Sequence, residues 1–296
     1  MELIVIGSGP AYTDRAGSAA SSYLLRAGDA ALLLDLGQGA FPNLASTLEP
    51  SVLAAVLVSH LHPDHFIDLV PLRHYLRYEF DPPRRVRVVG PAGLADRLDA
   101  LHGHPDFAAI SLDVAPLEPG LQRIGPFTVE ARRVAHTDES YALRVSVAGS
   151  GAAGAATGTA AGAATGLAAG AAAGADSAAA GAAAGAATGA AAGAAAGAAA
   201  GLVYSGDCGR ADDLVPLIRP GDTLLCEASF GAGTVPHGAE HLTAADAGRV
   251  AATGHAARVL LTHIQMGFDR GQALAAAQAA FAGSVQLITE GDRFEV

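Results

Sequence analysis

Short apolar runs bounded by glycine-rich or polar turns recur along most of this 296-residue chain. Such runs are typical of buried β-strands, whereas apolar residues spaced three and four apart predict helices. Helices are predicted over 66–78, 93–101, 214–218, 243–253 and 271–281, and strands over 3–6, 21–26, 31–35, 54–58, 86–89, 107–113, 127–132, 141–147, 202–205, 223–226, 259–262, 285–288 and 294–296. The pattern therefore predicts an α/β protein.

The composition changes abruptly between residues 148 and 201. Nearly every residue there is Ala or Gly, with glycine at about every fourth position and Asp176 as the one charged side chain. The stretch lacks bulky side chains for a core, and each glycine costs a helix roughly 1 kcal/mol relative to alanine. We expect a low-complexity insertion, loosely ordered and helical in parts, that expands the turn of a hairpin. Residues 1–147 and 202–296 are then two parts of one domain.

The densest group of metal-binding side chains follows the strand predicted at 54–58. His60, His62, Asp64 and His65 fall within six residues. Imidazole and carboxylate together suit Zn²⁺ or a similar first-row ion. A single ion cannot easily take four side chains from so short a loop, so two adjacent ions are predicted. The alternative, a surface loop that happens to be rich in histidine, is disfavoured because later parts of the chain supply further ligands.

The pattern His-x-His-x-Asp-His after a strand resembles that of the metallo-β-lactamase fold superfamily. That family completes a two-metal site with a lone histidine, a bridging aspartate and a last histidine, each at a strand end. The resemblance implies an αββα sandwich, in which two mixed β-sheets are flanked by helices. It also implies that His60, His62 and His136 hold one divalent ion, that Asp64, His65 and His263 hold the other, and that Asp207 bridges the two.

Three later motifs resemble the ribonuclease Z-like branch of this superfamily: Glu-Ala-Ser at 227–229, His-Leu-Thr at 241–243 and Leu-Thr-His at 261–263. In that branch an acidic residue follows the strand, and a histidine just before a helix assists catalysis. The resemblance implies that His241, as imidazolium, protonates the leaving alkoxide. Asp64 is expected to be the other catalytic residue.

Three more positions are expected to support the site or to contact substrate: Asp35, Ser140 and Glu227. Asp35 matches an aspartate that the family keeps near the metal loop. Ligating imidazoles need an acceptor for their second N–H, which Asp35 would provide, although a turn-capping carboxylate is the alternative. The glycine-rich turn at 7–10 is expected to lie near the site, and Cys208 is expected to be a packing residue rather than a ligand.

The segments 134–145, 204–209 and 224–229 resemble small actinobacterial members regarded as cyclic-nucleotide phosphodiesterases. The resemblance implies hydrolysis of a phosphodiester such as 3′,5′-cyclic AMP by a hydroxide held between two metal ions. The second expectation is tRNA 3′ processing, although the basic, glycine-containing arm that clamps tRNA in ribonuclease Z has no counterpart here. A lactonase or thioesterase, an iron-dependent redox protein and a non-catalytic binding module are further alternatives.

The composition limits which binding partners and which cellular location are expected. The net charge of −11 argues mildly against broad nucleic-acid binding. The two cysteines make no disulfide framework, no apolar run is long enough to span a membrane, and the N-terminus lacks a signal-peptide pattern. A cytoplasmic protein without a membrane partner is expected. Zn²⁺ is the expected metal, with Mn²⁺ or Fe²⁺ as alternatives. A homodimer is one candidate for the oligomeric state, which the sequence does not fix, because dimers are common in the branch that the chain resembles.

Overall fold

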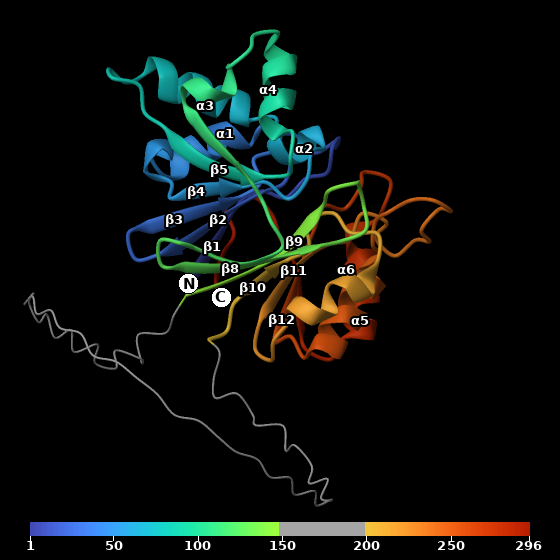
Figure 1. The fold of residues 1–296 in the computed structure, drawn as a ribbon. Helices are drawn as coiled ribbons and strands as arrows, with labels where there is room; N and C mark the ends of the chain where they lie inside the picture. The colour runs from blue at the N-terminus through green and yellow to red at the C-terminus, as the bar shows by residue number, and fades with distance from the viewer. Residues whose placement is uncertain (148–198) are drawn as a thin grey trace, which may run out of the picture. The chain divides into compact units, whose positions relative to one another are not determined.

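The computed structural model describes residues 1–147 and 199–296 (Figure 1). The low-complexity insertion expected at 148–201 therefore lies almost entirely outside the described residues. The described residues form two seven-stranded β-sheets. Helices cover the outer face of each sheet, those from the first half of the chain on one side and those from the last quarter on the other (Figure 1).

The first sheet combines an antiparallel half with a parallel half. Strand β14 pairs antiparallel with β1, and β1, β2 and β3 pair antiparallel in turn. The pairs from β3 to β6 are parallel. In spatial order its strands are β14 (Arg293–Glu295), β1 (Glu2–Gly7), β2 (Ser22–Ala27), β3 (Ala30–Leu34), β4 (Ala55–Leu57), β5 (Val86–Gly90) and β6 (Leu112–Pro116).

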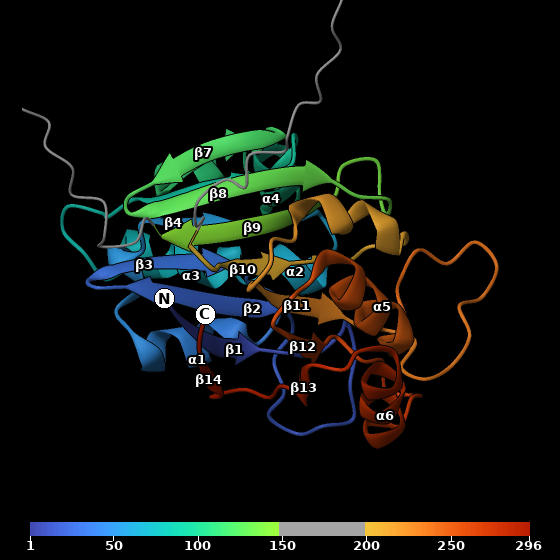
Figure 2. The same cartoon turned by 90° about the horizontal axis from the view of Figure 1, so that it is seen from below.

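The second sheet has the same mixed character, and Figure 2 shows its strands side by side. Strands β10 to β13 are parallel, and β7 to β10 pair antiparallel. In spatial order its strands are β13 (Ser284–Leu287), β12 (Arg258–Thr262), β11 (Thr223–Glu227), β10 (Leu202–Tyr204), β9 (Tyr141–Val147), β8 (Phe127–Arg133) and β7 (Gly120–Ile124).

Helices α1, α3 and α4 cover the first sheet, and α5 and α6 cover the second (Figures 1 and 2). The N-terminus of α5 has a capping box, because Thr243 and Asp246 each accept a hydrogen bond from the other's backbone N–H. The helices are α1 (Ala40–Thr47), α2 (Pro63–Phe66), α3 (Leu69–Tyr78), α4 (Leu94–His102), α5 (Ala244–Gly254) and α6 (Arg270–Ala280), with 3₁₀ turns at Pro50–Val52, Ala108–Ile110, Ala211–Asp213 and Val215–Leu217.

Three apolar layers hold the sandwich together. In β1, Leu3 and Val5 belong to the layer between the sheets, while Ile4 and Ile6 belong to the layer under the first group of helices. A third layer lies between the second sheet and α5 and α6. Strands buried on both faces are apolar throughout, which is why they appear as continuous apolar runs in the sequence. The expected αββα sandwich is confirmed.

Some expected elements differ from the structure. The strand expected over 107–113 is wrong: a 3₁₀ turn occupies Ala108–Ile110, and β6 begins only at Leu112. Phe107 is apolar because it packs in the helical layer, where its ring stacks on His102. The helix expected over 66–78 is divided into α2 and α3 by Asp68, whose carboxylate accepts a hydrogen bond from the backbone N–H of Phe41 at the start of α1 (2.8 Å).

The two strands that flank the insertion pair antiparallel, with Leu202 opposite Val145. This is the pairing expected for two strands of one hairpin. The buried carboxylate of Asp222 fixes the start of β10, because it accepts hydrogen bonds from the Arg144 guanidinium (2.7 and 2.9 Å) and from the backbone N–H of Gly201 (2.8 Å).

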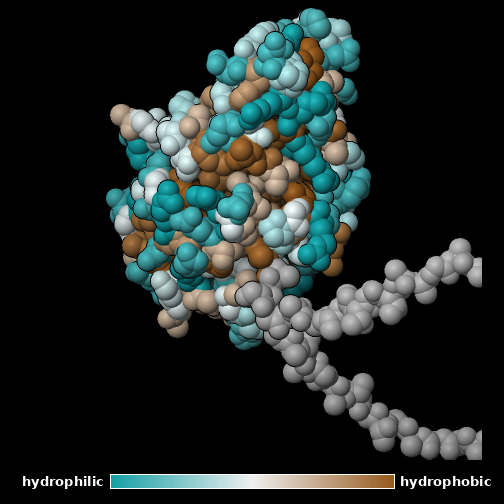
Figure 3. All heavy atoms as spheres, turned by 90° about the vertical axis from the view of Figure 1, so that its left-hand side faces the viewer, coloured by the Kyte–Doolittle hydropathy of each residue, from teal (hydrophilic) through white to brown (hydrophobic). Residues whose placement is uncertain are grey.

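Figure 3 shows one face of the molecule, on which hydrophobic residues gather near the middle with hydrophilic residues around them. Nothing in the described part of the chain shows what covers this area, so the homodimer stays a prediction. No helix among the described residues is long and apolar enough to cross a membrane.

Candidate metal centre

The predicted ligands lie at the ends of strands from both sheets. His60 to His65 follow β4, His136 follows β8, Asp207 follows β10, and His263 is the first residue after β12. Because β4, β10 and β12 run parallel to neighbouring strands, their carboxyl ends meet at one edge of the sandwich. Residues far apart in sequence are thereby brought together.

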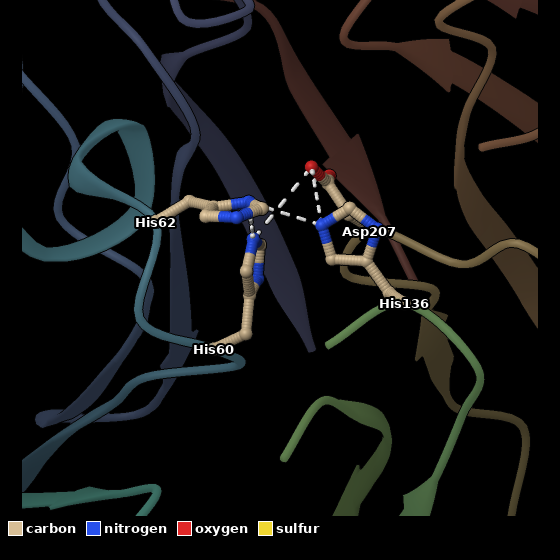
Figure 4. Close-up of side chains that lie close together, drawn as sticks. All are labelled: His60, His62, His136 and Asp207. Atoms are coloured by element: carbon tan, nitrogen blue, oxygen red, sulfur yellow. Dashed lines mark hydrogen bonds and ion pairs between the residues drawn. The ribbon is translucent and has the colours of Figure 1, made fainter. Parts of the chain in front are cut away.

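The first cluster contains His60, His62, His136 and Asp207 (Figure 4). His62 Nδ1 lies 3.1 Å from His60 Nε2 and 3.0 Å from His136 Nε2. One oxygen of Asp207, Oδ2, lies 3.7 Å from Nε2 of both His60 and His136. Three ring nitrogens and one carboxylate oxygen therefore lie within 4.8 Å of one another, close enough to share one metal ion.

The second cluster contains Asp64, His65 and His263, again with Asp207. The other oxygen of Asp207, Oδ1, lies 3.3 Å from His65 Nε2 and 3.7 Å from His263 Nε2. Asp64 Oδ2 lies 3.1 Å from His263 Nε2. Asp207 thus presents one oxygen to each cluster, which is the arrangement expected of a bridging carboxylate.

Two polar atoms in the second cluster are buried without a hydrogen-bond partner in the described part of the chain: His65 Nε2 and Asp207 Oδ1. Buried polar atoms nearly always have a partner, so both atoms point to a group that satisfies them. Imidazole nitrogen and carboxylate oxygen are ligands for first-row divalent ions. The clusters therefore fit divalent metal ions.

Most of the imidazoles in these clusters are held by hydrogen bonds on the ring nitrogen that faces away from the cluster. Such contacts fix the ring orientation and the position of the proton. The holding contacts are His60 Nδ1 to Ser59 Oγ (3.1 Å), His65 Nδ1 to Asp35 Oδ2 (2.8 Å), His136 Nδ1 to the Glu240 carbonyl (2.7 Å) and His263 Nδ1 to Ser229 Oγ (3.0 Å).

Asp35 is completely buried and has a positive φ of 57°. Its carboxylate accepts hydrogen bonds from the backbone N–H and the hydroxyl of Ser59 (2.6 and 2.8 Å), from Tyr204 Oη (2.6 Å) and from His65 Nδ1. The following turn packs directly on the histidine loop, because a Cβ at Gly37 would lie 2.0 Å from the Asp64 carbonyl oxygen. Asp35 therefore joins β3, β4 and β10 at the base of the site.

In the second cluster, the charges of the carboxylates and imidazoles shift each other's pKa values toward the charged forms. Burial lowers the pKa of His65, but the charges of Asp207 and Asp35 outweigh it and hold that pKa well above its ordinary value. Burial raises the pKa of Asp207, yet the charges of His263 and His65 hold it well below its usual range. His60 lies where burial dominates, and its pKa is well below the ordinary value.

His241 lies beside the two clusters, just before α5, and it forms a third group with Glu227 and His263. Its Nδ1 lies 3.1 Å from Glu227 Oε2 and 3.8 Å from Asp207 Oδ2. Burial lowers the pKa of His241, but the hydrogen bond to Glu227 and the charge of that carboxylate outweigh burial and raise it to about 9. His241 is therefore positively charged near neutral pH.

A pocket of about 240 Å³ opens onto these residues. Its walls combine residues of the histidine loop and the clusters with Pro10, from the turn expected near the site, and with residues 11, 12 and 265, to which the sequence analysis gave no role. The lining residues are Pro10, Ala11, Tyr12, His62, Pro63, Asp64, Asp207, His241, His263 and Gln265.

Ser140 lies away from the clusters. Its hydroxyl contacts Thr137 (Oγ–Oγ1 2.7 Å) and accepts a hydrogen bond from the Thr137 backbone N–H, so it shapes the turn that carries His136. Cys208 is buried in the apolar layer under α5, and no candidate metal cluster among the described residues includes it.

The sequence analysis missed three kinds of site residue. Tyr204 and Ser229 lay inside quoted motifs, but their hydroxyls make contacts that only the fold reveals. Glu240 acts through its backbone carbonyl, which carries no sequence signal. Tyr12 and Gln265 line the pocket from loops on which no motif falls.

Residues 32–264 match the family model of the β-lactamase superfamily domain, and the chain belongs to this family of metallo-hydrolase fold. The uncharacterized protein ML1173 of Mycobacterium leprae is 32% identical over 94% of this chain and 83% of its own length. Ribonuclease Z of Salinispora arenicola is 29% identical over 98% of this chain and 94% of its own length.

Among solved structures, the metallo-β-lactamase fold protein YhfI from Bacillus subtilis matches with a TM-score of 0.74 at 22% identity, covering 100% of this chain and 99% of that one. This likeness shows the fold. The expected membership of the metallo-β-lactamase superfamily and the resemblance to ribonuclease Z are confirmed, while the resemblance to cyclic-nucleotide phosphodiesterases stays a prediction.

Proposed function

We propose that this protein is a metal-dependent phosphodiesterase that hydrolyses a cyclic nucleotide such as 3′,5′-cyclic AMP. The observation that carries the proposal is the position of Asp207, with one oxygen toward each cluster at the wall of a pocket that His241 also lines. The ribonuclease Z relative supports phosphodiester chemistry, because the linkages of RNA are phosphodiesters.

In this proposal His60, His62 and His136 hold one ion, Asp64, His65 and His263 hold the other, and Asp207 bridges them. Two ions of Zn²⁺, or of Mn²⁺ or Fe²⁺, would lower the pKa of water and offset charge developing on the phosphoryl oxygens. Asp64 also lines the pocket, where we assign it a second role in orienting the attacking water.

His241 acts as the general acid. Its Nδ1 is directed toward Glu227, which leaves Nε2 and its proton to serve the pocket that the ring lines. A pKa of about 9 keeps that proton in place at neutral pH until an alkoxide, a far stronger base, leaves phosphorus. Glu227 fixes the ring, since its other oxygen accepts a hydrogen bond from the backbone N–H of Cys208 (2.7 Å).

tRNA 3′ processing is the second candidate, favoured by the similarity to ribonuclease Z along nearly the whole chain. The chain's own charge favours the smaller substrate. The insertion contains no Lys or Arg and the protein has a net charge of −11, whereas binding to a nucleic acid depends on many Lys and Arg contacts to phosphates.

The direct test is hydrolysis of 3′,5′-cyclic AMP by the metal-loaded protein, followed by separation of cyclic AMP from AMP. The wild-type protein should release AMP, and His65→Ala should not. His104→Ala, which alters an exposed histidine outside the clusters, is the matched control and should retain full activity. A wild-type protein that leaves cyclic AMP intact would refute the proposal and direct attention to a precursor tRNA, and then to esters and lactones.

The role of His241 has its own test. His241→Ala should reduce kcat by a factor of about 10² to 10⁴ while the metal content, measured by mass spectrometry, stays that of the wild type. Loss of metal in this variant would show that His241 is a ligand in its group with Glu227 and His263 rather than an acid.

A further inference from the structure

Tyr12 places a large aromatic ring at the rim of the pocket. The residue is 63% exposed, although it lines the same pocket as Asp207 and His263. The pocket volume of about 240 Å³ lies below the range of about 300–1,000 Å³ that encloses most ligands of drug size. A nucleotide whose phosphate reaches the clusters must therefore extend over the rim, where this ring lies.

The loop that carries Tyr12 is fixed at both ends. Glu290 Oε1 accepts hydrogen bonds from Ser18 Oγ (2.9 Å) and from the backbone N–H of Ser8 (3.3 Å), on either side of the loop. The Gln38 side-chain amide donates a hydrogen bond to the carbonyl of Ala11, next to the tyrosine (2.7 Å). The ring is thus presented by a backbone that needs little ordering when a ligand binds, which favours affinity.

Gln265 contributes a polar group to the same pocket. Its backbone N–H is held by the Ser229 carbonyl (3.2 Å), whereas its side-chain amide makes no hydrogen bond within residues 1–147 and 199–296. An aromatic face together with a free amide matches the chemistry of a nucleobase, which stacks through its ring and forms hydrogen bonds along its edge.

We propose that Tyr12 and Gln265 form a nucleobase-binding site: the ring stacks on the base, and the amide binds the base edge. This inference rests on the proposed phosphodiesterase function, because it assumes that the phosphate lies at the clusters. It identifies the substrate as a base-bearing cyclic phosphate. An amide that pairs with N6 and N7 of adenine would favour adenine over guanine.

Steady-state hydrolysis of cyclic AMP tests the stacking. Tyr12→Ala should raise KM about tenfold, equivalent to about 1.4 kcal/mol, and leave kcat within about twofold, whereas Tyr12→Phe should keep the wild-type KM. Tyr78→Ala is the matched control, because Tyr78 is 68% exposed on α3 and does not line the pocket, and it should change neither constant. An unchanged KM in Tyr12→Ala overturns the stacking role.

A binding measurement separates this inference from the proposed reaction. The fluorescence of 2-aminopurine riboside 5′-monophosphate is quenched when its base stacks, and a phosphodiesterase does not consume this probe. Titration with metal-loaded wild type and Tyr12→Phe should quench it, and Tyr12→Ala should not. If cyclic AMP is not hydrolysed but this quenching pattern holds, the proposed reaction is refuted and the nucleobase-binding site is supported. Equal quenching by Tyr12→Ala and the wild type overturns the nucleobase-binding site.

The amide is tested by the preference between bases. Gln265→Leu should lower the ratio of kcat/KM for cyclic AMP over cyclic GMP by about tenfold, since each well-placed pair of hydrogen bonds discriminates by about this much. A kcat/KM ratio equal to that of the wild type would show that Gln265 does not bind the base.

Discussion

Asp35→Asn removes a buried negative charge while keeping the shape of the side chain. Asn tolerates the left-handed conformation that Asp35 adopts, with φ of 57°, so the substitution adds little backbone strain. The wild-type carboxylate accepts four hydrogen bonds, two of them from Ser59, one from Tyr204 and one from His65. An amide can accept at one end only, because its other end donates.

Asp35→Asn affects the clusters through its hydrogen bond to His65. If the amide nitrogen faces the ring, Nδ1 must become the acceptor, and the ring proton moves to Nε2, the atom that lies 3.3 Å from Asp207. A proton there blocks binding of an ion. If the amide turns, its nitrogen faces the backbone N–H of Ser59 instead. Either arrangement leaves one buried donor unsatisfied, which costs about 1–3 kcal/mol of unfolding free energy.

We expect Asp35→Asn to bind Zn²⁺ about 10–100-fold more weakly, the usual effect of removing such a supporting contact. Competition with a chromophoric chelator measures this affinity, and urea unfolding of the metal-free protein measures the loss of stability. Asp29→Asn, at an exposed turn, is the matched control and should change neither. Wild-type Zn²⁺ affinity in Asp35→Asn would refute the assignment of the ring proton to Nδ1.

Three further outcomes follow from the fold. Gly37→Ala would place a Cβ 2.0 Å from a backbone oxygen of the histidine loop, so the amount of metal that the protein retains on dialysis should fall more than about tenfold. The control Gly267→Ala has open space around its Cβ and should retain as much metal as the wild type. Asp222→Ala leaves Arg144 buried and unpaired, and urea unfolding should show a loss of about 3–5 kcal/mol with unchanged metal content; a loss below about 1 kcal/mol would contradict the buried ion pair. Hydrogen bonds outweigh burial and lower the pKa of Glu290, so its stabilising effect is present above the unfolded value of about 4.3 and is lost as pH falls below it. The unfolding free energy of Glu290→Gln should therefore decrease less between pH 7 and pH 3 than that of the wild type, and equal decreases would contradict this.

The strands and the proposed ligands could be predicted from sequence for one shared reason. A strand buried on both faces appears as an apolar run, and a proposed ligand follows closely after its end, as His263 does directly after β12. His60 and Asp207 are likewise the third residues after β4 and β10. Elements without such a run were missed: the edge strand β7 is mostly exposed and lacks the alternation of apolar and polar residues.

The groups that orient the ligands were harder to predict because their identity carries little signal. The Glu240 carbonyl that holds His136 could belong to any residue type. The side chains of Ser229 and Tyr204 reach His263 and Asp35 across sequence separations of 34 and 169 residues, so only the packing of the sheets brings them together. Sequence motifs thus predict which side chains a metal centre uses, whereas the proton positions on those side chains depend on the fold.

Salt dependence separates the two candidate substrates, and two arginines close in sequence to the proposed ligands each face a carboxylate. Arg133 binds Glu139 at 2.6 Å, and Arg210 lies 3.9 Å from Asp213, so both would have to exchange a carboxylate for a phosphate of a polynucleotide. A cyclic nucleotide has one negative charge, so kcat/KM should fall only about threefold between 50 and 200 mM salt. Cleavage of a tRNA held by six or more phosphate contacts would fall more than about 100-fold over the same range. A steep dependence with cyclic AMP would show that cations beyond the metal centre attract the substrate, and it would contradict the pairing of these arginines.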